Sequence, residues 1–198
     1  MRPGNASVAV EEPSPAAPED PLRAVGRARF ERSCSVPAAF FEERSDDVSR
    51  ACWEMARRFS RGGRLLAFGA GPAGASDADH VAVEFVHPVI VGKRALPALA
   101  LEDDLAERVR LLGSADDVAM AIDSRGDSPD VQAALAVAAD RGLLTVALAG
   151  PGLADPSRWD HAFVVAEEDP WVVQETLETL YHVLWELVHV FFDHEGLL

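Results

Sequence analysis

The chain has 198 residues, 48% of them hydrophobic, and a formal net charge of −15. This apolar share suffices for the core of one domain, whereas the negative charge opposes binding of nucleic acid or of an anionic membrane. The sequence contains neither 18 consecutive apolar residues nor a basic segment followed by an apolar one, so we expect no transmembrane helix and no secretory signal. Cys34 and Cys52 form no CxxC motif, which favours a reducing cytoplasm.

The N-terminal third is predicted to be helical after a tail. Residues 1–22 are rich in Pro, Ala, Ser and Glu, which predicts disorder, and a single domain is expected over residues 23–198. Residues 23–35 predict a short helix that Pro37 breaks, and residues 38–43 predict another. Ser45 is the expected cap of an amphipathic helix over residues 46–60.

From residue 65 onward, short apolar segments alternate with helical patterns. The expected strands are 65–68, 95–101, 118–122, 143–148 and 161–165. The expected helices are 77–86, 102–112, 128–141 and 170–194, with Asp169 as the last cap. This alternation predicts the α/β class: a three-layer sandwich in which helices flank a five-stranded parallel sheet. Ligands of such sheets bind outside the carboxyl ends of the strands.

A glycine-rich segment follows the first expected strand. Gly69, Gly71 and Gly74 lead into a helix expected to start at Ser76 or Asp77. A strand, a glycine turn and a helix N-terminus together present N–H groups to an anion. Gly71, Gly74 and Ser76 are therefore candidate phosphate contacts, although the same pattern also fits an ordinary turn.

The loop from residue 122 to residue 128 is a second candidate for ligand binding. It offers the hydroxyls of Ser124 and Ser128, the backbone of Gly126 and the guanidinium of Arg125. Asp123 and Asp127 would repel an anion there. A helix cap with a turn explains the same residues, and both interpretations remain open at this point.

Polar residues at helical spacing point to a metal. His80 and Glu84 lie one turn apart, and Gln174 and His182 lie two turns apart on the last helix. The sequence around Gln174 and His182 is very apolar, and buried polar groups need partners. We expect these four groups to converge, and their donor atoms suit zinc or a similar divalent ion. Glu178, on the same face as His182, is an additional carboxylate.

The last helix is also apolar around most of its circumference, which predicts burial against other subunits. The residues in question are Leu177, Leu180, Leu184, Leu187, Val188, Phe191 and Phe192. The acidic surface and the tail would in addition suit a protein partner.

Over residues 45–194 the chain resembles the sugar isomerase (SIS) domain family, in particular its phosphoheptose isomerase branch. The similarity lies in His80-Val-Ala-Val-Glu84 after the glycine loop, in Asp123-Ser-Arg-Gly-Asp-Ser128, and in Gln174 with His182. The resemblance implies a flavodoxin-like topology and a homotetramer, with a dimer as the smaller alternative. It implies zinc held by His80, Glu84, Gln174 and His182. It also implies a phosphorylated sugar, or a related small anion, that is isomerised with Glu84 as base and His182 as acid.

The chain departs from that branch at the expected phosphate loops. Asp123 and Arg125 stand where the branch has serine, and Trp171 stands where it has aspartate. The segment from Leu101 to Ser114 is shortened. Two hypotheses follow: an isomerase, or a binding or assembly protein without catalysis that keeps the metal site.

Overall fold

The computed structural model describes residues 20–88, 90–194 and 196. Its elements in chain order are α1 (Pro21–Ser60), β1 (Leu65–Gly69), α2 (Gly71–Val86), β2 (Ala98–Leu101), α3 (Leu105–Leu112), β3 (Val118–Asp123), α4 (Pro129–Asp140), β4 (Leu144–Ala149), the short 3₁₀ helix η1 (Pro156–Arg158), β5 (His161–Val164) and α5 (Pro170–Asp193). Within the described ranges, no helix is long and apolar enough to cross a membrane.

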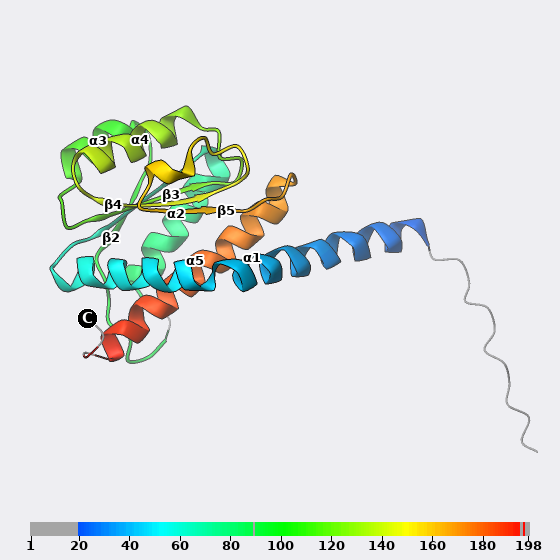
Figure 1. Ribbon diagram of the computed structural model, residues 1–198, viewed down its shortest axis with the longest axis horizontal. Coiled ribbons are helices and arrows are strands. Elements are labelled where there is room, and N and C mark those ends of the chain that lie inside the picture. The colour runs from blue at the N-terminus through cyan, green and yellow to red at the C-terminus, as the bar shows by residue number, and fades with distance from the viewer. Residues whose placement is uncertain (1–19, 89, 195, 197–198) are drawn as a thin grey trace, which may run out of the picture.

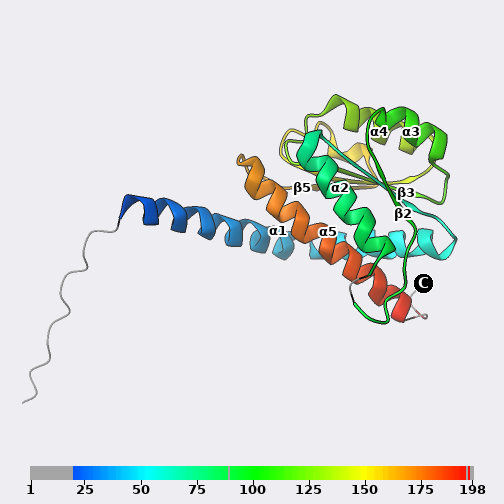
Figure 2. The same ribbon diagram turned by 180° about the vertical axis from the view of Figure 1, so that it is seen from behind.

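The five strands form one parallel sheet in the order β2-β1-β3-β4-β5. This is the flavodoxin-like order, in which the direction of strand addition reverses beside β1. Side chains alternate between the two faces of each strand. Leu65 and Ala67 join the core beneath α1, α2 and α5, whereas Leu66 and Phe68 join the core beneath α3 and α4. Figures 1 and 2 show these two helical layers, and the predicted three-layer sandwich is confirmed.

Helix α1 differs from its prediction because it runs without a break through Pro37. Proline removes one helical hydrogen bond, but the apolar stripe continues on both sides of it, from Val36 and Phe40 to Phe59. Burial of this stripe against α5 and the sheet outweighs the local preference for a break. The helix begins within the predicted tail, with Asp20 accepting a hydrogen bond from the Leu22 N–H. Residues 1–19 of that tail lie outside the described residues.

Helix α2 begins at Gly71, five or six residues earlier than predicted. The glycines serve close packing of this first turn. A Cβ atom on Gly69 would come within 2.1 Å of the Gly74 carbonyl oxygen, and one on Gly74 within 2.7 Å of the Ile122 carbonyl oxygen. The glycines of this segment, which resembles a phosphate turn, therefore mainly allow the first turn of α2 to pack closely against β1 and β3.

The remaining boundaries differ by small amounts, with two exceptions. Strand β2 starts three residues later than expected, directly after Pro97, which has no N–H to donate to the ladder. Helix α3 starts at Leu105 because Asp104 adopts a left-handed conformation with φ of 51°. Two predicted caps are confirmed: Ser128 accepts from the Val131 N–H, and Asp169 from the Trp171 N–H. The predicted cap Ser45 is wrong, because it lies in the interior of the continuous helix α1.

The apolar face of α5 is covered within the chain itself. Leu177, Leu180, Leu184 and Val188 are each 0% exposed, because α1 packs along α5 on the side away from α2. For these four side chains the expected exposure to another subunit is wrong, whereas Leu187, Phe191 and Phe192 are half-buried against the same core. This part of α5 is covered by one helix of 40 residues, α1, where the sequence predicted three shorter helices.

Candidate functional site

Helices α2 and α5 lie side by side and bring three predicted residues together (Figure 2). One carboxylate oxygen of Glu84 lies 3.3 Å from Nε2 of His80 and 3.2 Å from Nε2 of His182. The two ring nitrogens are 3.4 Å apart. His80 and Glu84 share one face of α2 because four residues separate them. The contacts therefore form a compact triangle of two imidazoles and one carboxylate.

A second carboxylate joins this triangle from α5. One donor atom each of His80, Glu178 and His182 lies within 4.8 Å of the others. Glu178 precedes His182 by one helical turn and so shares its face. The cluster thus contains the extra carboxylate noted from the sequence, and it offers more donors than the four predicted residues alone.

Gln174 lies on α5 one turn before Glu178, and it contacts a residue that sequence reasoning missed. Its amide nitrogen donates to both carboxylate oxygens of Asp77, at 3.3 and 3.2 Å. This contact turns the NH₂ group toward Asp77 and leaves the amide oxygen for other partners. The available signal was spacing, since Asp77 precedes His80 by three residues on the same helix face.

Asp77 is 8% exposed. Burial raises the pKa of its carboxyl, and the charge of Glu178 raises it further, whereas the Gln174 hydrogen bond and His80 act in the opposite direction. A carboxylate in this position requires a partner, and Gln174 provides one. The pair fixes the two helices to each other beside the cluster.

Aromatic side chains form the buried wall of the cluster. The Tyr181 ring lies 5.6 Å from that of His80 and 4.8 Å from that of His182, measured between centroids. Burial raises the pKa of Tyr181, and nearby carboxylates add to the effect, so the phenol stays neutral. The indole N–H of Trp185 donates to the Glu84 carbonyl at 3.0 Å and holds this part of α2 against α5.

A cavity of about 380 Å³ opens beside the cluster. It lies between the start of α2, the loop after β3 and the start of α5. Its lining residues are Ala70, Gly71, Pro72, Ala73, Asp123, Ser124, Arg125, Asp127, Ser128, Pro170, Trp171 and Gln174. Gln174 belongs to both the lining and the polar cluster and so connects the two, whereas His80, Glu84 and His182 are not among the lining residues. Small-molecule sites have volumes of this order.

None of the protein-family models matches the chain. Curated proteins do: it is 35% identical to the phosphoheptose isomerase of Thermodesulfovibrio yellowstonii, over 82% of this chain and 89% of that protein. It is 34% identical to the phosphoheptose isomerase of Solidesulfovibrio magneticus, over 88% and 93% of the two chains. The chain belongs to the phosphoheptose isomerase family.

Solved structures of phosphoheptose isomerases have the same fold. The structure from Francisella tularensis superposes with a TM-score of 0.78 at 22% identity, covering 87% of this chain and all of that one. The structure from Neisseria gonorrhoeae gives a TM-score of 0.75, also at 22% identity, covering 84% and 98%. The resemblance proposed from His80, Glu84, Gln174 and His182 is confirmed at the level of family and fold.

In this phosphoheptose isomerase family member, the predicted phosphate contacts fall into two groups. Gly71, Ser124, Arg125 and Ser128 line the 380 Å³ cavity. Gly74 and Ser76 do not line it, and the Gly74 N–H donates to the Ala70 carbonyl at 3.2 Å. Gly126 is buried behind the lining, where its φ of 84° requires glycine.

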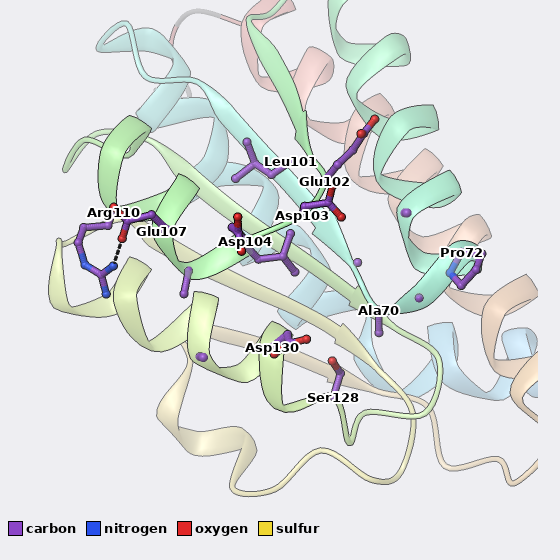
Figure 3. Close-up of a pocket in the computed structure, with 16 residues that line it drawn as sticks. Ala70, Pro72, Leu101, Glu102, Asp103, Asp104, Glu107, Arg110, Ser128 and Asp130 are labelled. Carbon is purple, nitrogen blue, oxygen red and sulfur yellow. Dashed lines mark hydrogen bonds and ion pairs between the residues drawn. The ribbon is translucent and has the colours of Figure 1, made fainter.

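A larger cavity, of about 740 Å³, lies on the other side of the segment from Ala70 to Pro72, which joins β1 to α2. Figure 3 shows carboxylates around it: Glu102, Asp103 and Asp104 between β2 and α3, and Asp130 on α4. Glu107 pairs with the one arginine of the lining, Arg110. Ser128 and Gly71 line both cavities, so the two are neighbours across the start of α2.

Proposed function

We propose that this protein is a sugar isomerase that interconverts the aldose and ketose forms of a phosphosugar through an enediol. The observation that carries the proposal is the His80–Glu84–His182 triangle, placed beside a sugar-sized cavity through Gln174. Relatives named phosphoheptose isomerase support it.

We propose a divalent ion, in particular Zn²⁺, at the triangle. Zinc bonds of about 2.0–2.1 Å in a tetrahedron place the ligand atoms about 3.3–3.4 Å apart. The separations here are 3.2, 3.3 and 3.4 Å, and two imidazoles with a carboxylate are common zinc ligands. Gln174 would supply the fourth ligand through its amide oxygen, with Glu178 close by. When bound, such an ion polarises a carbonyl group.

Two residues of the triangle would move the proton in addition to holding the ion. Glu84 has an 18% exposed side chain and its carboxylate would take the proton from the carbon next to the carbonyl. His182 would donate a proton to the substrate oxygen through Nδ1, because Nε2 is the ring nitrogen that would hold the ion. Tyr181 and Trp185 would hold the two helices in place during these steps.

We propose that the substrate lies in the 380 Å³ cavity. Gly71 at the start of α2 and the side chains of Ser124, Arg125 and Ser128 are the groups available to a phosphorylated sugar. Gly74, Ser76 and Gly126 would contribute indirectly, because their backbone positions the residues that line the cavity.

Turnover of sedoheptulose 7-phosphate by purified, zinc-loaded protein tests the proposed function. We expect activity that disappears after removal of metal and in Glu84→Gln. A zinc-loaded protein that leaves this substrate and other aldose or ketose phosphates unchanged would contradict it.

The second candidate is a binding or assembly protein, which two features favour. Asp123 and Asp127 place negative charge in the loop that would hold phosphate. The first turns of α1 project beyond the rest of the molecule (Figure 1) and expose Leu22, Val25 and Phe30. We propose that the chain self-associates through this part of α1, into a tetramer or a dimer, and a protein partner would use the same surface.

A further inference from the structure

The loop between β3 and α4 already holds an anion, which is the side chain of Asp123. Its Oδ1 accepts the Arg125 N–H at 3.1 Å, and its Oδ2 accepts the Ser128 N–H at 2.9 Å. Ser128 is the cap residue of α4, so this second donor belongs to the positive end of a helix. Backbone N–H groups arranged in this way bind phosphates and carboxylates. Here the carboxylate comes from the chain itself.

Neighbouring loops hold these donors in place. Asp123 is 6% exposed, and its carbonyl accepts the Gly150 N–H at 2.9 Å. The Arg125 carbonyl accepts the Gly152 N–H at 2.9 Å. A Cβ atom on Gly126 would come within 2.5 Å of the Gly150 carbonyl oxygen, so the two loops are in tight contact. The loop therefore cannot turn its N–H groups toward another anion without losing these contacts.

The charges that face the cavity add to this effect. Asp123 and Asp127 contribute two negative charges to the lining, and Arg125 contributes one positive charge. A phosphate in the cavity would lose part of the attraction of Arg125 to the repulsion from Asp123. Neutral hydroxyl groups meet no such repulsion, and they can donate to a carboxylate or exchange hydrogen bonds with Ser124 and Ser128.

An aromatic side chain on α5 also lines the cavity. Trp171, in the first turn of α5, is 67% exposed and borders the same cavity. An indole face offers apolar contact to the C–H groups of a sugar and has no preference for a phosphate. Carboxylate acceptors together with an exposed tryptophan thus suit a polyhydroxyl group.

We infer that Asp123 is the specificity-determining residue of this pocket: it fills the anion site of the 123–128 loop, lowers the affinity for a phosphate, and lets the unphosphorylated sugar compete with its phosphate ester. The inference rests on the proposed function, because it concerns the substrate of the same pocket. It is nevertheless a statement about binding and does not require turnover.

Calorimetric titration of the zinc-loaded full-length protein with inorganic phosphate, sedoheptulose 7-phosphate and sedoheptulose tests it. Asp123→Ser frees at least one of the two N–H groups, and we expect both phosphates to bind roughly ten- to a hundredfold more tightly, since hydrogen bonds to charged groups have this strength. Binding of sedoheptulose should change far less than binding of the phosphates, because the introduced hydroxyl group can still exchange hydrogen bonds with the sugar. Asp127→Asn is the matched control, because it removes an equal charge from the same loop and leaves the Asp123 contacts in place. It should change phosphate affinity by less than about threefold.

Three results would overturn the inference. The first is unchanged phosphate affinity in a folded Asp123→Ser protein. The second is an equal gain in Asp127→Asn, which would assign the effect to net charge, and the third concerns the amide resonances of the loop.

Asp123→Asn, which keeps the shape of the side chain, provides a second test with an intermediate expected gain. The amide resonances of Arg125 and Ser128 should move upon phosphate addition in Asp123→Ser and stay fixed in the parent protein, and the reverse would also overturn it. Lack of isomerase activity with these affinities intact would instead contradict the proposed function alone.

Discussion

Three donor atoms, from His80, Glu84 and His182, define the chemistry of this molecule at the scale of single residues. Their separations of 3.2–3.4 Å match the spacing of ligand atoms around one tetrahedral zinc ion. Asp77 lies one helical turn before His80 and accepts a hydrogen bond from Gln174, the proposed fourth ligand. Residues of this outer kind tune a metal site by fixing the orientation of its ligands.

Replacement of His182 by alanine should abolish metal binding. Elemental analysis of the parent protein, purified without a tag, should show roughly one divalent ion per chain, and His182→Ala should show almost none. His87→Ala is the control, because His87 is an exposed residue at the end of α2. Full occupancy in His182→Ala would exclude the site.

Asp77 should act as a positioning residue for Gln174. Without the Asp77 carboxylate the Gln174 amide can rotate, and we expect Asp77→Ala to lower zinc affinity about 10- to 100-fold. Asp77→Asn keeps an acceptor for the amide and should restore most of this affinity. Asp79→Ala, on the exposed side of α2, should bind zinc normally. Equal losses in Asp77→Ala and Asp77→Asn would argue against a positioning role.

The two thiols should react very differently. Cys34 is exposed, whereas burial raises the pKa of Cys52 to about 12. A thiol with a raised pKa is protonated throughout the physiological range and is a poor nucleophile. At pH 8 a thiol reagent should label one cysteine per native chain and both after unfolding in urea. Rapid labelling of Cys52 in the native protein would show that α1 separates from α5.

At the scale of elements, α1 organises the molecule. It covers α5, and its arginines contact α5 and the loop before it: Arg29 pairs with Glu175 at 2.8 Å and Arg32 with Glu167 at 2.6 Å. These pairs are largely exposed to solvent, which screens them, so they contribute little to stability. Burial of Phe40, Val48, Met55 and Phe59 against the core therefore stabilises the position of α1 more than the ion pairs do. This burial is large enough to keep Pro37 within a continuous helix.

Pro37→Ala should stabilise the protein. Proline in a helix interior costs roughly 3 kcal/mol relative to alanine, and part of this should be regained when the N–H is restored. We expect a higher midpoint of urea unfolding. Ala38→Gly, at the next and exposed position, should lower the free energy of unfolding by about 1 kcal/mol, and with it the urea midpoint. A lower midpoint for Pro37→Ala would mean that the helix needs a proline bend to reach α5.

At the scale of the whole molecule, three exposed apolar side chains lie together near the start of α1. Leu22, Val25 and Phe30 are 81%, 69% and 69% exposed, and they occupy the part of α1 that projects past the sheet in both views (Figures 1 and 2). Apolar side chains grouped in this way mark an interaction surface. Closed symmetric association would cover them on every copy.

Light scattering at micromolar concentration should therefore report an oligomer. The triple variant Leu22→Glu, Val25→Glu, Phe30→Glu should form smaller species, because each substitution places a charge on the apolar surface of α1. Leu111→Glu, on α3, is the control at a position that is 72% exposed. A monomeric parent protein would contradict the proposed self-association.

The sequence by itself determined those features that depend on residues near one another in the chain. The alternation of apolar segments and helical patterns predicted the parallel sheet, and Ser128 and Asp169 marked two helix starts correctly. The pairing of His80 with Glu84 followed from helical spacing alone.

Tertiary structure decided the features that depend on contacts between distant segments. Pro37 stays helical because α1 packs against α5. The glycines before Asp77 belong to the first turn of α2 because they let that turn pack closely on β1 and β3. Asp77 reaches Gln174 across 97 positions of sequence. Helical spacing places Asp77 on the same face as His80, but it does not identify Gln174 as its partner. Asp123 looked from the sequence like a charge that repels an anion, and only the folded loop shows that its carboxylate occupies the anion site. Local preferences amount to about 1 kcal/mol or less for most residues, whereas burial of a single large apolar side chain contributes about 1.5–3 kcal/mol, so packing prevails where the two disagree.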